Sequence, residues 1–223
     1  DAIQGWKSPV STALKVEYLN TLLQVGFDTL DFGSFVSPKA IPQMADTAEV
    51  YHQLELEGVS TKLLAIVANL KGAEQAVLFE HITYLGFPFS ISETFQVRNT
   101  NSTTEQALEG LQQISDICAE HGKKLRVYLS MGFGNPYGDA WSAALVAQWV
   151  EKLQCQFEIA EFALSDTIGY ATAASAQDLF ETLNRQFPSL RFAAHLHVVK
   201  GREAALIKAC IAGGCHHFDT AIG

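Results

Sequence analysis

The sequence predicts an α/β fold in which parallel strands alternate with helices. Apolar, strand-like runs alternate with helix-periodic runs along the whole chain at roughly 30-residue spacing, and no Pro/Ser-rich linker separates them. Parallel strands need helical crossovers of this kind, whereas antiparallel neighbours can be joined by tight turns. We therefore expect a single domain over residues 1–223.

The individual elements follow one another in a regular order. The strand candidates, each an apolar run of strand length, are Thr29–Val36, Lys62–Asn69, Tyr84–Ile91, Leu125–Phe133, Glu158–Ser165, Arg191–Val198 and His216–Ile222. The helix candidates, each an amphipathic segment, are Ser11–Val25, Asp46–Leu56, Ala73–Glu80, Thr103–His121, Asp139–Leu153, Ala174–Phe187 and Gly201–Ala212. Every strand candidate except the last is followed by a helix candidate, which is the pattern of repeated βα units.

The number of units favours a barrel. The chain opens on the polar loop Asp1-Ala-Ile-Gln4, which would follow a strand. One further strand before this loop and one helix after Gly223 would complete eight βα units, so we expect a (β/α)₈ TIM barrel that lacks the first strand and the last helix in this chain. The alternative is a doubly wound open sheet. That fold commonly carries a glycine-rich phosphate loop after an early strand, and the sequence has no G-x-G-x-x-G or G-x-x-x-x-G-K-[ST] motif.

Composition limits the classes of partner. The net charge is −9 with only 15 Lys and Arg, which argues against nucleic acid as the main partner. No segment reaches the roughly 18 consecutive apolar residues of a membrane span, and no signal-peptide pattern begins the chain, so we expect a cytoplasmic protein without a membrane partner. The four cysteines show no C-x-x-C spacing, which indicates reduced, packed thiols. The oligomeric state stays open, with a homodimer as one option.

A histidine pair in the sixth strand candidate is the strongest sign of a functional site. His195 and His197 are separated by Leu196 within an otherwise apolar run. Alternate residues of a strand share a face and lie about 6.6 to 7 Å apart along it, so both imidazoles can converge on one metal ion. Histidines inside an apolar strand need a ligand or a hydrogen-bond partner. On spacing alone, two packed histidines with ordinary partners are an equal alternative.

The carboxyl ends of the predicted strands carry many polar residues. Catalytic groups of a TIM barrel lie at these strand ends and in the loops that follow. The polar residues at these positions are Asp1, Gln4, Asp31, Ser34, Asn69, Ser92, Glu93, Ser130, Asn135, Ser165, Asp166, Thr167, His195, His197, Asp219 and Thr220. Such nitrogen and oxygen donors suit a divalent ion, because carboxylates favour Mg²⁺ or Mn²⁺ and imidazoles favour Mn²⁺ or Zn²⁺.

Six motifs in order resemble a known family. Besides Asp1-Ala-Ile-Gln4 and His195-x-His197, they are Gly33-Ser-Phe-Val-Ser-Pro-Lys-Ala-Ile-Pro-Gln-Met-Ala-Asp46, Ser92-Glu-Thr-Phe-Gln-Val-Arg-Asn-Thr-Asn101, Tyr128-Leu-Ser-Met-Gly-Phe-Gly-Asn-Pro-Tyr137 and Ser165-Asp-Thr-Ile-Gly169. Together they resemble the 3-hydroxy-3-methylglutaryl-CoA lyase family of metal-dependent lyase and synthase barrels. The resemblance covers essentially the whole chain.

The resemblance implies a metal site and an acyl-CoA substrate. Asp1, His195 and His197 match three of the family's ligands to a divalent metal, for which we expect Mg²⁺ or Mn²⁺ rather than Zn²⁺. The family's fourth ligand, an Asn, and its loop Cys would follow Gly223, and its Arg would precede Asp1. The implied reaction is the cleavage of 3-hydroxy-3-methylglutaryl-CoA, or a close analogue, to acetoacetate and acetyl-CoA, as in leucine degradation.

The resemblance also suggests catalytic and substrate-binding residues. Asp166, Asp31 and Gln4 are the expected catalytic group, although Asp166 could instead cap the turn that follows it. Asp31 stands where the family usually has Glu, which shortens its reach. Ser34 and Thr167 are candidates to bind the substrate carboxylate.

Asn99, which we expect in a loop with Arg98, is a further candidate for substrate binding. A second histidine pair, His216 and His217, is expected to be structural, because adjacent strand residues point to opposite faces.

Two other functions remain open. A synthase of the isopropylmalate or homocitrate type would run a Claisen condensation on a similar Asp loop and H-x-H pair. A catalytically inactive barrel that acts as a binding module is the alternative from another class. The Ser92-Glu-Thr-Phe and Ser37-Pro-Lys segments favour the lyase.

Overall fold

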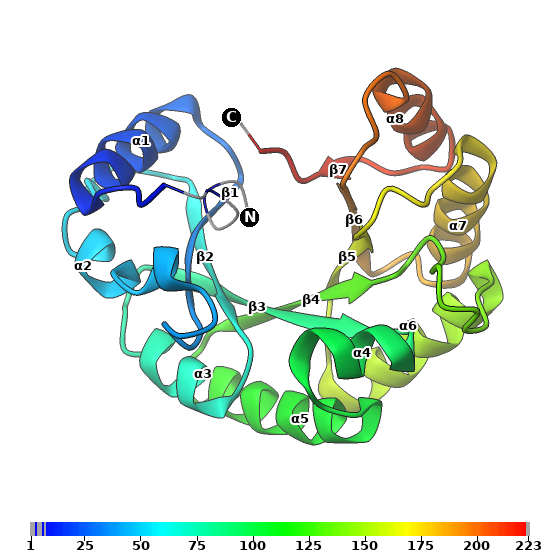
Figure 1. Ribbon diagram of the computed structural model, residues 1–223, viewed down its shortest axis with the longest axis horizontal. Coiled ribbons are helices and arrows are strands. Elements are labelled where there is room, and N and C mark those ends of the chain that lie inside the picture. Colours follow the sequence, from blue (N-terminus) through cyan, green and yellow to red (C-terminus); the bar gives the residue numbers. More distant parts are fainter. Residues whose placement is uncertain (1–2, 4–5, 7, 222–223) are drawn as a thin grey trace. The chain divides into compact units, whose positions relative to one another are not determined.

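The computed structural model describes residues 3, 6 and 8–221 and has an α/β fold (Figure 1). In this part of the chain the strands are β1 (Thr29–Phe35), β2 (Lys62–Val67), β3 (Ile82–Ser90), β4 (Lys124–Ser130), β5 (Glu161–Asp166), β6 (Arg191–Leu196) and β7 (His217–Phe218). They form one sheet in the sequence order β1-β2-β3-β4-β5-β6-β7. The pairs β1–β2, β2–β3, β4–β5, β5–β6 and β6–β7 are parallel. Six predicted strands are therefore confirmed with ends shifted by up to three residues, whereas the predicted His216–Ile222 strand is only His217–Phe218, and Ile222 lies outside the described residues.

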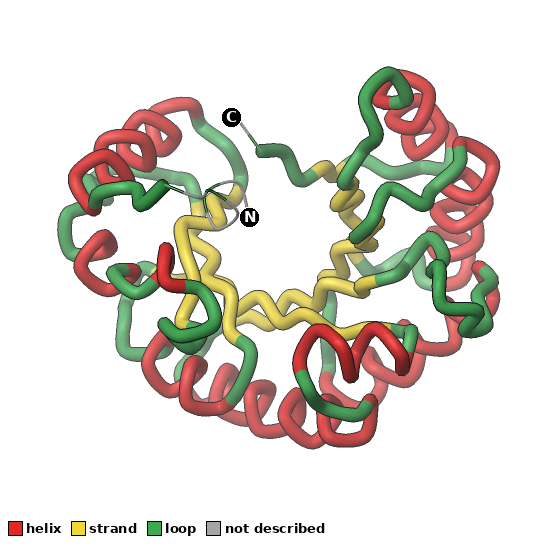
Figure 2. Tube along the Cα trace, viewed as in Figure 1, coloured by secondary structure: helices red, strands yellow, loops and turns green. Residues whose placement is uncertain are grey.

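Helices separate the strands along the chain (Figure 2). They are α1 (Thr12–Val25), the 3₁₀ turn η1 (Pro42–Met44), α2 (Thr47–Tyr51), α3 (Leu70–Ala76), α4 (Glu93–Thr100), α5 (Thr104–Glu120), α6 (Ala143–Phe157), α7 (Ala173–Gln186) and α8 (Glu203–Ala212). The predicted helical regions are confirmed. Helix α4 was not predicted: the expected loop around Arg98 and Asn99 is wrong, because both residues lie in this helix.

The chain divides into two compact units. The first comprises residues 1–87, 113–124 and 221–223, and the second comprises residues 88–112 and 125–220. Helices α1, α2 and α3 pack on β1 and β2 in the first unit, and α6, α7 and α8 accompany β5 to β7 in the second (Figure 1). The single domain over residues 1–223 stays a prediction.

Side-chain caps explain where several helices begin. The Ser11 and Ser142 hydroxyls accept backbone N–H bonds from Leu14 and Leu145, which satisfies donors that have no partner inside α1 and α6. Helix α1 ends at Gly26, whose φ of 84° is the left-handed conformation that glycine adopts without a side-chain clash.

The core of each unit is apolar. In the first unit Leu63 and Leu64 are at most 1% exposed, and in the second Phe133 packs on Phe180 with ring centroids 6.2 Å apart. All four cysteines are free thiols, and burial raises the pKa of Cys118 and Cys210 to about 12. No helix among the described residues is both long and apolar enough to cross a membrane.

A buried ion pair joins α1 to the segment before α2. Lys15, only 5% exposed, donates from Nζ to the Asp46 carboxylate at 2.6 Å and also to the backbone carbonyl of Gln43. The Thr12 hydroxyl donates to the other Asp46 oxygen at 2.7 Å. Burial would raise the pKa of Asp46, but the bonds from Lys15 and Thr12 outweigh it and hold this pKa below its usual value of 3.8. The pair anchors the 36–46 loop that follows β1.

We predict that Asp46→Asn lowers the free energy of unfolding by about 2 kcal/mol at neutral pH, because Lys15 keeps its buried charge without a counter-charge. A carboxylate whose folded-state pKa is lowered stabilises the fold above its unfolded pKa, and this contribution is lost as the pH falls through the folded pKa. In denaturant titrations the gap between wild type and variant should therefore shrink below about pH 4. A gap that stays constant down to pH 2.5 or so would contradict this role.

Candidate metal and substrate site

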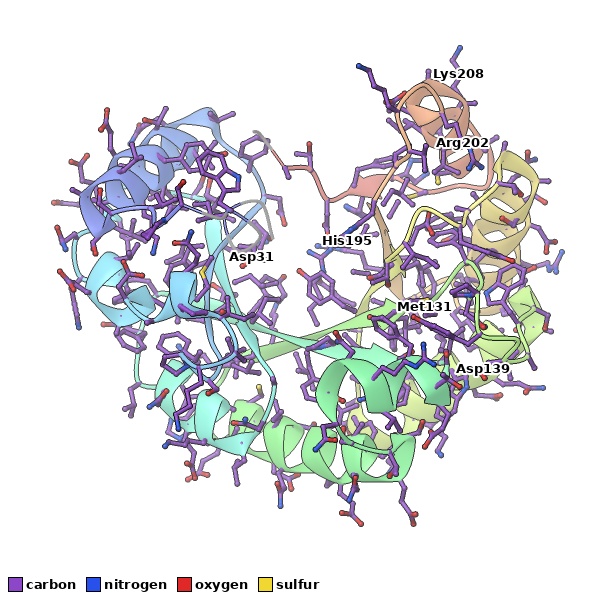
Figure 3. The ribbon with its side chains drawn as sticks, in the orientation of Figure 1. Asp31, Met131, Asp139, His195, Arg202 and Lys208 are labelled. Atoms are coloured by element: carbon purple, nitrogen blue, oxygen red, sulfur yellow. The ribbon has the colours of Figure 1, made fainter. Side chains whose placement is uncertain are left out.

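The two histidines of the H-x-H motif lie together at the carboxyl end of β6. The strand ends at Leu196, one residue before His197, whose backbone N–H extends the ladder by donating to the Asp166 carbonyl at 3.3 Å. The Nε2 atoms of His195 and His197 are 3.3 Å apart. Figure 3 shows His195 on the side of β6 that faces away from α7 and α8. The predicted convergence of the two imidazoles is confirmed.

The spacing of the imidazoles fits a shared metal ion. Two nitrogens bound to one ion at ~2.0–2.1 Å, with a bond angle of ~90–110°, lie about 2.9–3.4 Å apart. The observed 3.3 Å falls within this range. Burial and the neighbouring His195 lower the pKa of His197, which favours the neutral imidazole that metals bind.

The described residues supply only part of a metal shell. Within residues 3, 6 and 8–221, no three His, Cys, Asp or Glu side chains are arranged to hold an ion. The expected third ligand, Asp1, and the expected catalytic residue Gln4 lie outside the described residues. Their assignment stays a prediction.

Asp166 is the last residue of β5 and lies beside His197. Its side chain is 2% exposed, and its two carboxylate oxygens accept N–H bonds from Tyr170 at 2.7 Å and Ala171 at 3.1 Å. The structure therefore shows the turn-capping role that the sequence offered as an alternative. Burial raises the pKa of Asp166, against the opposing effect of these two bonds. A carboxylate with a raised pKa is a stronger proton acceptor, so the cap and a catalytic role are compatible.

Thr167 faces the end of β4. Its Oγ1 accepts the backbone N–H of Met131 at 3.3 Å, and a hydroxyl that accepts in this way can still donate its hydrogen to a ligand. Met131 is buried and has a φ of 59°, a conformation that few non-glycine residues adopt. Such local strain is concentrated at binding and catalytic sites.

Ser34 and Asp31 lie on β1 in the first unit. Ser34 is 6% exposed, and its Oγ has no hydrogen-bond partner among the described residues. A buried hydroxyl without a partner is costly in a finished core, so it is suited to a ligand oxygen. Asp31 is exposed and lies on the side of β1 away from α1 and α2 (Figure 3).

Asn99 lies near the end of α4, a helix that a distant aspartate holds in place. The Asp139 carboxylate accepts bonds from the Ser92 hydroxyl at 2.5 Å, from the Thr94 backbone N–H at 3.2 Å and from the Thr94 hydroxyl at 3.0 Å. Arg98 covers the Tyr137 ring at 4.8 Å from its centroid. These contacts fix α4 against the 131–139 segment, and Asn99 itself is exposed.

Arg126, Tyr128 and Asp219 lie near His195, and the sequence assigned none of them a specific role, although Asp219 was among the expected strand-end polar residues. The Asp219 carboxylate lies 3.0 Å from His195 Nδ1 and accepts a bond from Arg126 at 2.6 Å. The Tyr128 ring stands edge-on to His195 at 5.3 Å between centroids. Burial would raise the pKa of Asp219, but the hydrogen bonds and charges of His195 and Arg126 outweigh this effect and lower the pKa below its usual value. Asp219 is therefore a carboxylate at neutral pH. The position of Asp219 at a strand end was the sequence signal that could have identified it.

The fold and the site together define a class of protein. Parallel strands in sequence order present two converging imidazoles and an adjacent carboxylate at their carboxyl ends. This combination is typical of α/β barrel enzymes that hold a divalent metal at the carboxyl end of the strands.

The comparisons with known proteins identify the family. The family model described as HMGL-like matches residues 1–223, and the chain belongs to this family, whose enzymes depend in general on a divalent metal. The chain is 34% identical over 226 residues to the 3-hydroxy-3-isohexenylglutaryl-CoA/hydroxy-methylglutaryl-CoA lyase of Pseudomonas aeruginosa, covering 100% of this chain and 73% of the relative.

Solved structures show the same fold. A hydroxymethylglutaryl-CoA lyase from Pseudomonas aeruginosa superposes with a TM-score of 0.92 at 32% identity, covering 100% of this chain and 73% of that one. An HMG-CoA lyase from Acinetobacter baumannii, in complex with coenzyme A and 3-methylmalate, has a TM-score of 0.91 at 27% identity and covers 100% and 72% of the two chains. The predicted α/β barrel class is confirmed by these matches.

We predict that His197→Ala weakens Mn²⁺ binding at least about 100-fold, because one of the two converging nitrogens is removed. Isothermal titration of the full-length protein measures this loss. His216→Ala is the matched control, since His216 is a histidine outside the pair and should leave the affinity unchanged. Equal Mn²⁺ affinity for both variants would show that the H-x-H pair is not the metal site.

We predict that Asp139→Ala destabilises the second unit by about 1 kcal/mol, because the donors at the start of α4 lose their common acceptor. Hydrogen exchange should become faster in residues 93–100 while α7 stays protected. Unchanged exchange in α4 would mean that Asp139 does not hold this helix.

Proposed function

We propose that this protein is a divalent-metal-dependent acyl-CoA lyase that cleaves 3-hydroxy-3-methylglutaryl-CoA, or a close analogue, to acetoacetate and acetyl-CoA. The observation that carries the proposal is the pair of imidazole nitrogens 3.3 Å apart beside Asp166, in a chain of the HMGL-like family. The names of the relatives support a carbon–carbon lyase, and the coenzyme A in the Acinetobacter structure supports an acyl-CoA substrate.

His195, His197 and Asp1 would hold the metal, which we propose to be Mg²⁺ or Mn²⁺ rather than Zn²⁺. Two neutral imidazoles and one carboxylate leave the ion a net positive charge. When bound, the ion would supply Lewis-acid stabilisation of the negative charge that develops on the hydroxyl oxygen and would orient the substrate. Carbon–carbon cleavage in this direction is the reverse of a Claisen condensation.

The protein's own residues would bind the substrate and move the proton. Thr167 can donate its hydroxyl hydrogen to a substrate carboxylate, because its oxygen already accepts from Met131. The Ser34 hydroxyl of the first unit, which has no partner among the described residues, stays a proposed substrate-binding group. Asp166 would take the proton of the tertiary alcohol, since burial raises its pKa and two backbone N–H groups fix its orientation. As the alkoxide becomes the ketone, the electron pair of the broken carbon–carbon bond would leave on the acetyl-CoA enolate, and one proton from Asp166 or water would convert this enolate to acetyl-CoA.

Asp31 and Gln4 are proposed as further catalytic residues and Asn99 as a substrate contact. A homodimer and a cytoplasmic location stay predictions. A part in leucine degradation follows from the proposed substrate.

The direct test is product analysis with the full-length protein. Incubated with 3-hydroxy-3-methylglutaryl-CoA and Mg²⁺ or Mn²⁺, it should release acetoacetate and acetyl-CoA in equal amounts. Condensation of acetyl-CoA with a 2-oxo acid, without cleavage, would favour the synthase. Binding of coenzyme A without either reaction would favour the binding module. Turnover that persists after complete metal removal would overturn the mechanism.

We predict that Asp166→Asn lowers kcat about 10²- to 10⁴-fold with a smaller change in KM, because an amide cannot accept the proton but can still accept one of the two N–H bonds. Asp178→Asn on the exposed face of α7 is the matched control and should leave kcat unchanged. Steady-state kinetics and thermal melting separate the two roles of Asp166. If kcat holds while the melting temperature falls, Asp166 is a turn cap and not the base.

A further inference from the structure

A chain of side-chain contacts runs to His195 from the side opposite His197. Arg126, on β4, donates from Nη2 to Asp219 Oδ1 at 2.6 Å, and Asp219 Oδ2 lies 3.0 Å from His195 Nδ1. The backbone holds the middle member in place as well, since the Asp219 N–H donates to the Ala194 carbonyl at 3.0 Å. Strand β4, strand β6 and the segment after β7 therefore each contribute one member.

The Arg126–Asp219–His195 contacts are largely shielded from water. The side chains of Arg126, His195 and Asp219 are 11%, 19% and 24% exposed. The Tyr128 ring packs against both Arg126 and His195, at 5.2 Å from the Arg126 guanidinium and 5.3 Å from the centroid of the His195 ring. Shielding strengthens charge-assisted hydrogen bonds, and the packed ring limits rotation of the imidazole.

The chemistry of the contacts assigns the proton on His195. An ionised carboxylate only accepts hydrogen bonds, so the His195 nitrogen that faces Asp219 must carry the hydrogen. In a neutral His195 ring Nδ1 is then the donor and Nε2 carries the lone pair, and this Nε2 lies 3.3 Å from His197 Nε2. Asp219 contacts Nδ1, whereas the Nε2 atoms of His195 and His197 face each other, so Asp219 would not be one of the metal ligands.

We propose that Asp219 and Arg126 are positioning residues that orient His195 and fix its tautomer for metal binding, Asp219 directly and Arg126 by holding the carboxylate. This inference rests on the proposed metal-dependent function. It assigns a role to two buried charged residues that the proposed reaction does not otherwise use.

The test is Mn²⁺ affinity of the full-length protein without substrate, measured by isothermal titration and by the electron paramagnetic resonance signal of free Mn²⁺. Asp219→Asn should weaken binding about 10- to 100-fold, because the amide must turn its NH₂ group toward either His195 or Arg126. Arg126→Lys should weaken it less, since the charge remains and one bond can reform.

The matched control is Asp46→Asn, which removes a carboxylate paired with a buried Lys15 at the same 2.6 Å distance in the first unit. It should lower the melting temperature without changing the Mn²⁺ dissociation constant, so a loss of affinity in Asp219→Asn cannot be attributed to stability alone.

The possible outcomes are distinct. Wild-type affinity in Asp219→Asn overturns the proposal, and so does a loss as complete as that of His197→Ala, which would make Asp219 a ligand. In one outcome the wild type binds Mn²⁺ and Asp219→Asn weakens this binding, but the wild type does not cleave the thioester. The proposed lyase function then fails while the positioning role is supported. If the thioester is cleaved and Asp219→Asn binds normally, only the positioning role fails.

Discussion

The register of β5 against β6 is the constraint on which the candidate site depends. Ser165 pairs with His195 and Asp166 pairs with Leu196 along the parallel ladder. The His197 N–H extends this ladder to the Asp166 carbonyl. Because side chains alternate along a strand, His195 and His197 lie on one face, and the register brings the end of β5, where Asp166 lies, beside His197. A slip of one residue would move His195 and His197 to the face that carries α7 and α8.

Each unit carries a feature that a finished core would not keep. In the first unit a buried Ser34 hydroxyl has no partner among the described residues, and in the second unit Met131 adopts a left-handed backbone conformation. Each of these has a free-energy cost in the absence of a ligand. Free-energy costs of this kind are common at functional sites, where residues are kept for binding or catalysis although they destabilise the local structure. The compensation comes from the surrounding strands, whose apolar residues are almost fully buried.

The sequence could predict what local periodicity determines. The alternation of strands and helices, the shared face of His195 and His197, and the strand-end position of Asp166 all follow from spacing along the chain. Helix α4 was not predicted because its start is stabilised by a distant residue. Asp139, which accepts the hydrogen bond of the N-cap residue Ser92, lies 47 residues further along the chain. Its eight residues have little apolar character to mark a helix.

Ion pairs between residues far apart in the sequence could not be predicted either. Arg126 and Asp219 are 93 residues apart, and only the register of several strands brings them together beside His195. The same limit applies to Asp166, whose double role as turn cap and neighbour of His197 needs coordinates. Asp1 and Gln4 remain predictions.

The proposed metal centre requires that His195 and His197 bind one ion through their Nε2 atoms while Asp219 holds the hydrogen on His195 Nδ1. The most direct measurement is long-range proton–nitrogen correlation NMR on full-length protein with isotope-labelled histidine, with and without Zn²⁺ as a diamagnetic probe. His195 Nδ1 should carry a hydrogen in both states, and the ion should shift the signals of both Nε2 atoms. A hydrogen on His195 Nε2, or Zn²⁺ that leaves both Nε2 signals unchanged, would contradict the proposed metal centre.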